Sequence, residues 1–370
     1  MEGDHIKINE WLLPLSWLYG FGVNIRNIMF DFGMLKSKSF DVPVICVGNL
    51  TVGGTGKTPH TEYLIKLLSK NNQVAVLSRG YKRKTRGYIL ASTATKMPDI
   101  GDEPYQMKQK FPFIHMAVDR NRCHGIEQLI KPDVTPATDV IILDDAYQHR
   151  YVQPGVNILL MDYHRLIYYD KLLPAGRLRE PKSGKNRADI VIITKCPLYI
   201  TPMDRRGIER SLNLENWQKV FFTTFTYGSL YPLFGNRDNT LNLQELKEKD
   251  ILLLSGIASP EQLEYDLGKI TKFTSLHYGD HHNFTKKDIA EIENKAKGKI
   301  IVTTEKDASR LSELGSSVFS KSVADSIYVL PIEVSFMNNK EEEFNQIITS
   351  YVTKNSRNSI LLKNKNARKS

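Results

Sequence analysis

The chain has 370 residues, of which 41% are hydrophobic and 25% charged, and its formal net charge is +10. That length is long for one hydrophobic core and fits two α/β domains, and the composition argues against a chain that is disordered throughout. The three cysteines (Cys46, Cys123 and Cys196) have no metal-binding spacing, which favours reduced, buried thiols over a disulfide scaffold.

The positive charge is concentrated in two segments. Residues 79–86 hold five basic side chains and residues 354–370 hold six, with no acidic residue in either segment, so the rest of the chain carries −1. Such patches favour anionic partners: a phosphorylated substrate, acidic lipid headgroups or nucleic acid. For residues 354–370 the composition predicts a solvated, disordered tail.

Residues 1–36 are predicted to form an apolar segment at a membrane interface. They lack the basic leader of a secretory signal. Residues 11–23 are strongly apolar, but Pro14, Gly20 and Gly22 interrupt them before the roughly 20 residues of a spanning helix accumulate. Trp11, Trp17 and the aromatic residues around them suit a bilayer interface, and burial against the body of the protein is an equally weighted alternative.

Residues 48–59 are the most informative part of the chain. They read Gly-Asn-Leu-Thr-Val-Gly-Gly-Thr-Gly-Lys-Thr-Pro after the apolar run 42–47, which predicts a phosphate-binding loop between a buried strand and a helix ending near residue 69. Lys57 is expected to neutralise phosphate charge during catalysis, and Thr58 to place its hydroxyl on Mg²⁺. Thr51 stands where the common pattern has its first glycine, so the loop is of the Gly-Gly-x-Gly-Lys-Thr type. The candidate nucleotide-binding residues are Thr51, Val52, Gly53, Gly54, Thr55, Gly56, Lys57 and Thr58.

Apolar strands alternate with helices along the next part of the chain. Strands are expected at residues 74–77, 113–117, 140–143, 158–161 and 190–194, and helices at 103–109 and 121–130. This alternation predicts an α/β fold, with a P-loop NTPase-like parallel-sheet domain over residues 37–224 whose functional groups gather at the carboxyl ends of its strands. Residues 225–250, rich in aromatic residues, Pro, Gly and Asn, are predicted to be a linker. A second alternating series over 251–353 predicts a smaller α/β domain.

Several carboxylates and cations fall where these strands end. The apolar residues 140–143 run into Asp144 and Asp145, either of which could reach a metal ion. Asp102 and Glu103 precede a helix, where capping alone would also explain them. The basic run that begins at Arg79 is placed to hold an anionic acceptor. His277, His281 and His282 admit a zinc site only as a minor option, because no cysteine lies near them.

Taken in order, these motifs closely resemble the tetraacyldisaccharide 4′-kinase family, the lipid A 4′-kinases of Gram-negative envelope synthesis. The resemblance covers nearly the whole chain, with Ala146 in place of a frequent glycine and a basic tail beyond the usual end. Its motifs are Leu-Leu-Pro-Leu-Ser-Trp-Leu-Tyr-Gly at 12–20, the phosphate loop with Pro59, Ser-Arg-Gly-Tyr at 78–81, Gly-Asp-Glu-Pro at 101–104, Asp144-Asp145 with Gln148-His149, Leu-Pro-Ala-Gly at 173–176, Arg-Glu-Pro at 179–181, Asp280-His281, and Glu-Lys-Asp-Ala at 305–308.

The resemblance implies a membrane-associated P-loop kinase that uses ATP and Mg²⁺ to phosphorylate the 4′-hydroxyl of a tetraacyldisaccharide 1-phosphate. It implies Asp102 as the base, with His281 as its partner across an interdomain cleft. Candidates for Mg²⁺ or its water shell are Thr58, Asp144, Asp145, Glu103 and Glu180, and candidates for the lipid substrate are Arg79, Tyr81 and Arg120. The implied location is the cytoplasmic face of the inner membrane, with peripheral or monotopic attachment and no obligate protein partner.

Two other functions compete with this interpretation. A membrane-recruited P-loop ATPase switch without a lipid acceptor would also use the Gly-Gly-x-Gly-Lys-Thr loop and an amphipathic terminus. Nucleic-acid binding through the basic patches is disfavoured, because few aromatic residues are interleaved with them and no recognition motif appears.

Overall fold

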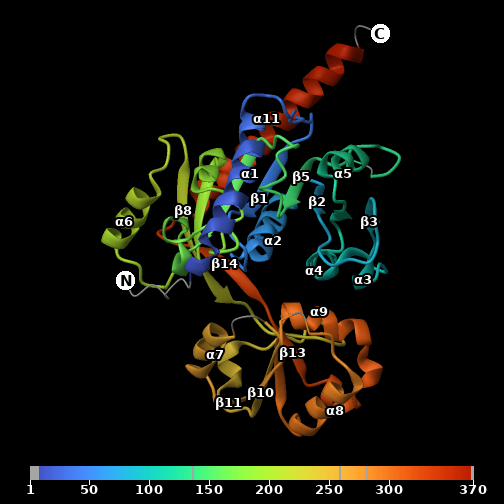
Figure 1. Ribbon diagram of the computed structural model, residues 1–370. Helices are drawn as coiled ribbons and strands as arrows, with labels where there is room; N and C mark the ends of the chain where they lie inside the picture. The colour runs from blue at the N-terminus through green and yellow to red at the C-terminus, as the bar shows by residue number, and fades with distance from the viewer. Residues whose placement is uncertain (1–7, 136, 258–259, 281, 368–370) are drawn as a thin grey trace.

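The fold is that of a computed structural model, which describes residues 8–135, 137–257, 260–280 and 282–367, with side chains through residue 355. It has two α/β domains, the larger above the smaller in Figure 1, connected by extended strands. This confirms the predicted α/β class and the smaller second domain.

The larger domain is built on a nine-stranded sheet in the order β14-β8-β7-β6-β1-β5-β2-β4-β3. The edge strands β3 and β14 are antiparallel to their neighbours and the others are parallel. The central strands are buried along their whole length, which explains their unbroken apolar sequences. The strands are β1 (Val44–Asn49), β2 (Val74–Ser78), β3 (Ile89–Ala91), β4 (His115–Val118), β5 (Val140–Asp144), β6 (Val156–Asp162), β7 (Ile190–Thr194), β8 (Lys219–Tyr227) and β14 (Ile332–Phe336).

Helices cover both faces of this sheet. Leu64 of α2, Met107 of α4 and Phe344 of α11 share one buried cluster on the first face. Ile126 of α5 and Ile208 of α6 pack on the other. The helices are α1 (Leu13–Asp31), α2 (Lys57–Leu68), α3 (Met97–Ile100), α4 (Asp102–Lys110), α5 (Arg122–Leu129), α6 (Pro202–Leu212) and α11 (Glu341–Ala367), with 3-10 turns η1 (Glu10–Leu12), η2 (Tyr163–Arg165), η3 (Ile167–Tyr169) and η4 (Lys182–Arg187).

The smaller domain has a five-stranded sheet in the order β11-β10-β12-β13-β9, in which only β9 is antiparallel. Its two faces are covered by α8 and α9 on one side and by α7 on the other. The elements are β9 (Tyr231–Pro232), β10 (Ile251–Ser255), β11 (Phe273–His277), β12 (Ile300–Thr304), β13 (Ile327–Leu330), α7 (Glu261–Gly268), α8 (Lys286–Lys295), α9 (Glu305–Leu314), α10 (Lys321–Ala324), η5 (Leu243–Leu246) and η6 (Ser316–Val318).

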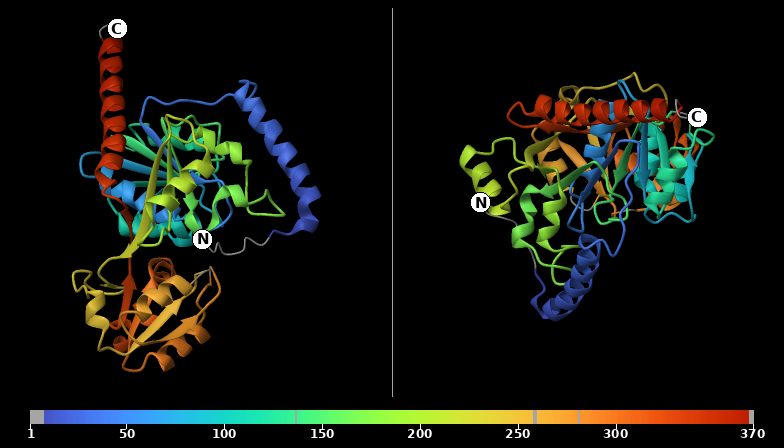
Figure 2. Two further views of the ribbon diagram at one scale, coloured as in Figure 1. Left: turned by 90° about the vertical axis from the view of Figure 1, so that its left-hand side faces the viewer. Right: turned by 90° about the horizontal axis from the view of Figure 1, so that it is seen from above.

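The domain boundaries differ from those predicted. Residues 332–367, assigned to the second domain and the tail, return to the first: β14 pairs with β8, and Phe344 of α11 packs with Phe221 of β8. The predicted linker 225–250 supplies the end of β8, strand β9 and η5 instead. Helix α11 continues through Ala367, where a disordered tail was expected, and it extends away from the body of the protein (Figure 2). These assignments depend on contacts between residues that are distant in sequence.

Candidate active site

The predicted phosphate loop connects β1 to α2. Gly53 and Gly56 have positive φ angles of 119° and 83°, a region that side chains with a Cβ rarely adopt. A Cβ on Gly56 would also lie 2.7 Å from the Phe225 ring. The helix begins at Lys57, so the free N–H groups of its first turn follow directly on the loop, as an anion-binding site requires.

Buried polar side chains of the neighbouring strands and helix form hydrogen bonds to this loop. Asn49 donates to the hydroxyl of Thr55 at 2.8 Å, and Thr194, at the carboxyl end of β7, donates to the Thr55 carbonyl at 3.0 Å. His60 Nδ1 lies 2.7 Å from the Gly56 carbonyl. Burial lowers the pKa of His60 to about 4, so the ring is neutral at physiological pH and its Nδ1–H donates to that carbonyl. Side chains of the protein itself therefore support the loop conformation.

The two aspartates at the end of β5 have different environments. Asp144 is buried and accepts hydrogen bonds from Thr61 and Ser78 at 3.3 and 3.2 Å. Burial and the charge of Asp145 raise the pKa of Asp144. Asp145 pairs with Lys57 at 3.6 Å and with Arg179 at 3.4 Å. Although burial alone would raise the pKa of Asp145, these two cations hold it below its usual range.

Glu103, in the first turn of α4, belongs to the same group of charges. Burial raises its pKa to about 7, and the charge of Asp144 adds to this effect. Among the described residues, no group of three or more His, Cys, Asp or Glu side chains is arranged to hold a metal ion by itself. Mg²⁺ is usually held by one or two carboxylates together with phosphate oxygens and water, and burial beside other carboxylates disfavours the charged forms of Asp144 and Glu103, which a bound cation would stabilise. The oxygen donors present therefore fit Mg²⁺.

Glu180 has a different neighbourhood. It is buried, and its Oε2 pairs at 2.7 Å with Arg187, whose guanidinium lies 4.8 Å from the centre of the Tyr147 ring. Its place near a metal remains a prediction.

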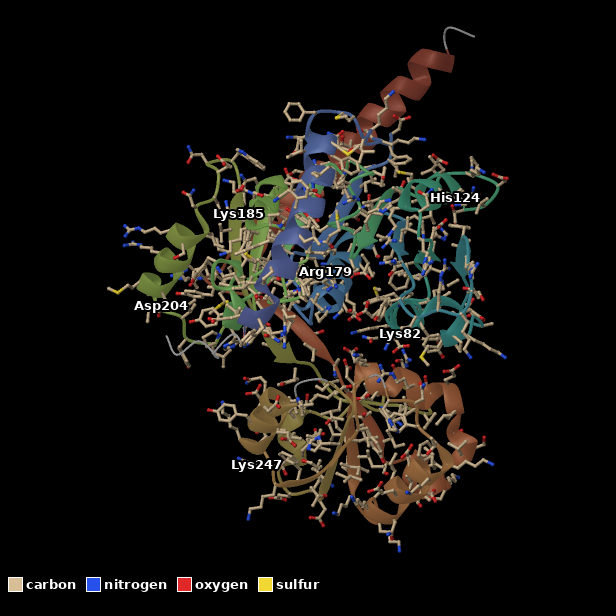
Figure 3. The ribbon with its side chains drawn as sticks, in the orientation of Figure 1. Lys82, His124, Arg179, Lys185, Asp204 and Lys247 are labelled. Atoms are coloured by element: carbon tan, nitrogen blue, oxygen red, sulfur yellow. The ribbon has the colours of Figure 1, made fainter. Side chains whose placement is uncertain are left out.

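Arg179, which sequence reasoning did not select, contacts Asp145 instead, and it lies beside α1 (Figure 3), where its carbonyl accepts a hydrogen bond from Tyr19 at 2.8 Å. The only signal for it was the Arg-Glu-Pro motif itself.

Asp102 opens α4 and faces the second domain, where Arg310 of α9 contacts it at 2.8 Å. Its predicted partner, His281, lies outside the described residues. The preceding residue, Asp280, pairs with Lys306 at 2.6 Å. Asp102 is next to Glu103, so the candidate base and one of the three candidate metal-site carboxylates share the start of α4.

The predicted substrate residues lie in the segments that follow β2 and β4. Arg79, Tyr81 and Arg120 are all exposed, and Lys82, in the same basic run, is at the edge of the first domain that faces the second (Figure 3). Burial and the nearby charges of Arg122, Arg26 and Arg79 lower the pKa of His149 to about 4. A positive region thus extends from the carboxylates toward α1, which carries Arg26.

Helix α1 lies on the outside of the first domain (Figure 2). Polar contacts hold it there: the Ser16 hydroxyl donates to the Leu172 carbonyl at 3.0 Å and accepts from the Ala175 N–H at 2.9 Å. Trp11 and Trp17 are 93% and 72% exposed, so the alternative of burial against the body is wrong for the two tryptophans, although Phe30 of the same segment is buried against Tyr151. No described helix combines the length and apolarity needed to cross a membrane.

The chain matches known proteins over nearly its full length. A sequence model of the tetraacyldisaccharide-1-P 4′-kinase family matches residues 8–353. A tetraacyldisaccharide 4′-kinase of Phocaeicola vulgatus is 58% identical over 366 residues, covering 97% of this chain and 99% of that protein. One from Bacteroides thetaiotaomicron is 54% identical over the full length of both chains. The crystal structure of LpxK from Aquifex aeolicus in complex with ATP superposes with a TM-score of 0.72 at 30% identity, covering 92% of this chain and 98% of that one.

Proposed function

The chain belongs to the tetraacyldisaccharide-1-P 4′-kinase family, and from this we propose that it transfers the γ-phosphoryl group of ATP to the 4′-hydroxyl of a tetraacyldisaccharide 1-phosphate. The observation that carries the proposal is the meeting of Lys57 of the phosphate loop, the Asp144–Asp145 strand end and Glu103, which directly follows Asp102 at the start of α4. The alternative of an ATPase switch without a lipid acceptor is not supported, since the relatives matched over their full lengths are named as kinases.

In this proposal the loop residues 51–58 hold the phosphates of ATP. Their N–H groups and the first turn of α2 bind the phosphate oxygens, and Lys57 offsets the charge that develops on the γ-phosphoryl oxygens. The Thr58 hydroxyl and one or two carboxylates among Asp144, Asp145 and Glu103 would hold Mg²⁺ or its water shell, together with phosphate oxygens. When bound, this ion would neutralise phosphate charge and help to align the leaving group.

Asp102 acts as the base. Its carboxylate accepts the proton of the 4′-hydroxyl as that oxygen forms a bond to the γ-phosphorus, and the bond from phosphorus to the β–γ bridging oxygen breaks to release ADP. His281, its proposed partner, would take part from the second domain. Phosphoryl transfer depends mainly on positioning and charge neutralisation, which suits a site built from preplaced side chains.

The lipid substrate would approach from the side of α1. The exposed aromatic residues of α1 suit a bilayer interface, and the positive region that includes Arg79 suits the 1-phosphate or anionic headgroups, with Tyr81 and Arg120 beside it. We place the enzyme peripherally on the cytoplasmic face of the inner membrane. There the acyl chains can remain in the bilayer while the sugar hydroxyl reaches the site.

The test is transfer of label from γ-labelled ATP to a tetraacyldisaccharide 1-phosphate in detergent with Mg²⁺. Wild-type protein should produce labelled lipid, and Lys57→Ala should abolish it. Lys66→Ala is the matched control, because Lys66 lies on the same helix in an exposed ion pair with Glu333. ATP consumption by the wild type without labelled lipid would reject the assigned acceptor.

A further inference from the structure

Helix α9 of the second domain is joined to α4 of the first by ion pairs at both ends of α4. Glu305, the first residue of α9, contacts Lys110, the last residue of α4, at 2.5 Å. Lys110 also contacts Glu62 of α2 at 2.5 Å. At the other end, Arg310 reaches Asp102, the first residue of α4. These contacts fix α4 along its axis relative to the phosphate-loop helix and to the second domain.

The Arg310 guanidinium is held in place by its own domain. Its side chain is 2% exposed and its Nη1 lies 3.3 Å from Asp307 Oδ1. Asp307, which is fully buried, accepts from the Gly256 N–H at 2.8 Å and from the Thr304 hydroxyl at 2.7 Å. A guanidinium that is held by these contacts is preorganised, so it loses little conformational entropy when it binds a carboxylate of the other domain.

Two donors of Arg310 converge on one oxygen of Asp102. Nη2 lies 2.8 Å and Nε 3.3 Å from Asp102 Oδ2. A two-donor contact from a buried guanidinium restrains the orientation of a carboxylate more strongly than an exposed pair would. The carboxylate is itself 26% exposed, so it stays open to an incoming hydroxyl while the guanidinium holds it.

We propose that Arg310 is a positioning residue that presents the Asp102 carboxylate to the acceptor hydroxyl. Because Arg310 belongs to the second domain, the base is correctly oriented only while that domain is docked on the first. The proposal rests on the proposed role of Asp102 as the base. It also assigns a purpose to the segment 305–310, whose Glu305 and Arg310 together set the position of α4.

The test is a double-mutant cycle between Arg310→Met and Asp102→Asn, measured by label transfer to the lipid. Arg310→Met should lower kcat at least tenfold and leave the KM for ATP within twofold of wild type. Arg310→Lys, which keeps the charge, should have a kcat between those of the wild type and Arg310→Met. In the Asp102→Asn background the same Arg310→Met substitution should lower kcat by less than a further twofold. Lys269→Met is the matched control, since Lys269 forms an exposed pair with Asp266 on the second domain.

Rescue separates positioning from folding. Millimolar guanidinium should restore part of the kcat of Arg310→Ala, and tetramethylammonium at the same concentration should not. Two results would overturn the positioning role alone. One is a decrease in kcat of the double mutant that equals the product of the decreases of the two single mutants, and the other is a kcat of Arg310→Met above that of the wild type. Full activity of Asp102→Asn would reject Asp102 as the base and with it the role of Arg310, whereas absence of labelled lipid from the wild type would reject the kinase assignment.

Discussion

Replacing Gly56 by alanine should weaken ATP binding far more than it weakens the fold. Gly56 has φ 83° and ψ 25° at the start of α2, so an alanine there must adopt a left-handed conformation that costs roughly 1–2 kcal/mol. Its Cβ would also lie 2.7 Å from Cζ of Phe225, and relieving such overpacking costs about 1–3 kcal/mol. Together the two effects oppose the present loop conformation by roughly 2–5 kcal/mol.

Much of this strain can be relieved by a change in the loop alone, at the expense of the nucleotide site. If about 2 kcal/mol of it opposes binding, the Kd for ATP should rise roughly 30-fold. Titration calorimetry with ATP would measure that change, and thermal unfolding would report the fold. The double substitution Gly56→Ala with Phe225→Leu should recover the part of the loss caused by the clash.

Gly207→Ala is the matched control. Gly207 lies within α6 and has no positive φ, and a Cβ added there would meet no other atom within 4 Å. Alanine should therefore leave ATP binding unchanged and stabilise the helix by about 0.5–1 kcal/mol. An ATP affinity of Gly56→Ala within twofold of wild type, with unchanged Tm, would refute the claim that the loop requires this conformation.

Three further predictions concern stability and membrane binding. Burial raises the pKa of Glu62 from 4.5 to about 7 despite Lys110, so between these pH values the folded state holds a proton that the unfolded state has lost, and this contribution to stability falls as pH rises from 4.5 to 7. Glu62→Gln should therefore flatten the fall in Tm over that range. A profile of Tm against pH that the substitution leaves unchanged would contradict the raised pKa. Phe344→Ala should cost roughly 3–5 kcal/mol in chemical denaturation because Phe344 is buried in the first-domain core, and a loss below about 1 kcal/mol would argue that α11 does not pack there. Trp11→Ser with Trp17→Ser should reduce sedimentation with anionic vesicles while Tm stays within about 2 °C, since both side chains are exposed; undiminished vesicle binding would count against α1 as the contact.

Much of the site could be predicted from local sequence. The glycine pattern before Lys57 predicts a phosphate loop because only glycine readily adopts the backbone angles seen at Gly53 and Gly56. The strand predicted over residues 190–194 has those bounds as β7, because a strand buried on both faces has an unbroken apolar sequence. The placement of Asp144 and Asp145 beside Lys57 follows from the same rule, since parallel strands end at one edge.

Other parts of the site come from pairings that no local pattern encodes. Thr194 and His60 are ordinary residues in sequence, yet they support the loop because β7 and α2 bring them under it. Arg179 reaches Asp145 from a segment 34 residues further along the chain. Sequence reasoning selected the Arg-Glu-Pro motif and chose Glu180 within it, while the structure gives the contact with Asp145 to Arg179.

The α/β class, the phosphate loop, the acidic strand end and the family thus follow from the amino-acid sequence alone. The first three depend on backbone preferences and apolar periodicity over a few neighbouring residues, whereas the family follows from the resemblance of its ordered motifs. The folded chain was needed to learn that residues 332–367 complete the first domain, and that Arg310 meets Asp102 across 208 positions of sequence. Such contacts are selected by the burial of whole helix and sheet faces and by charge pairing between distant segments, so no short window of residues carries them.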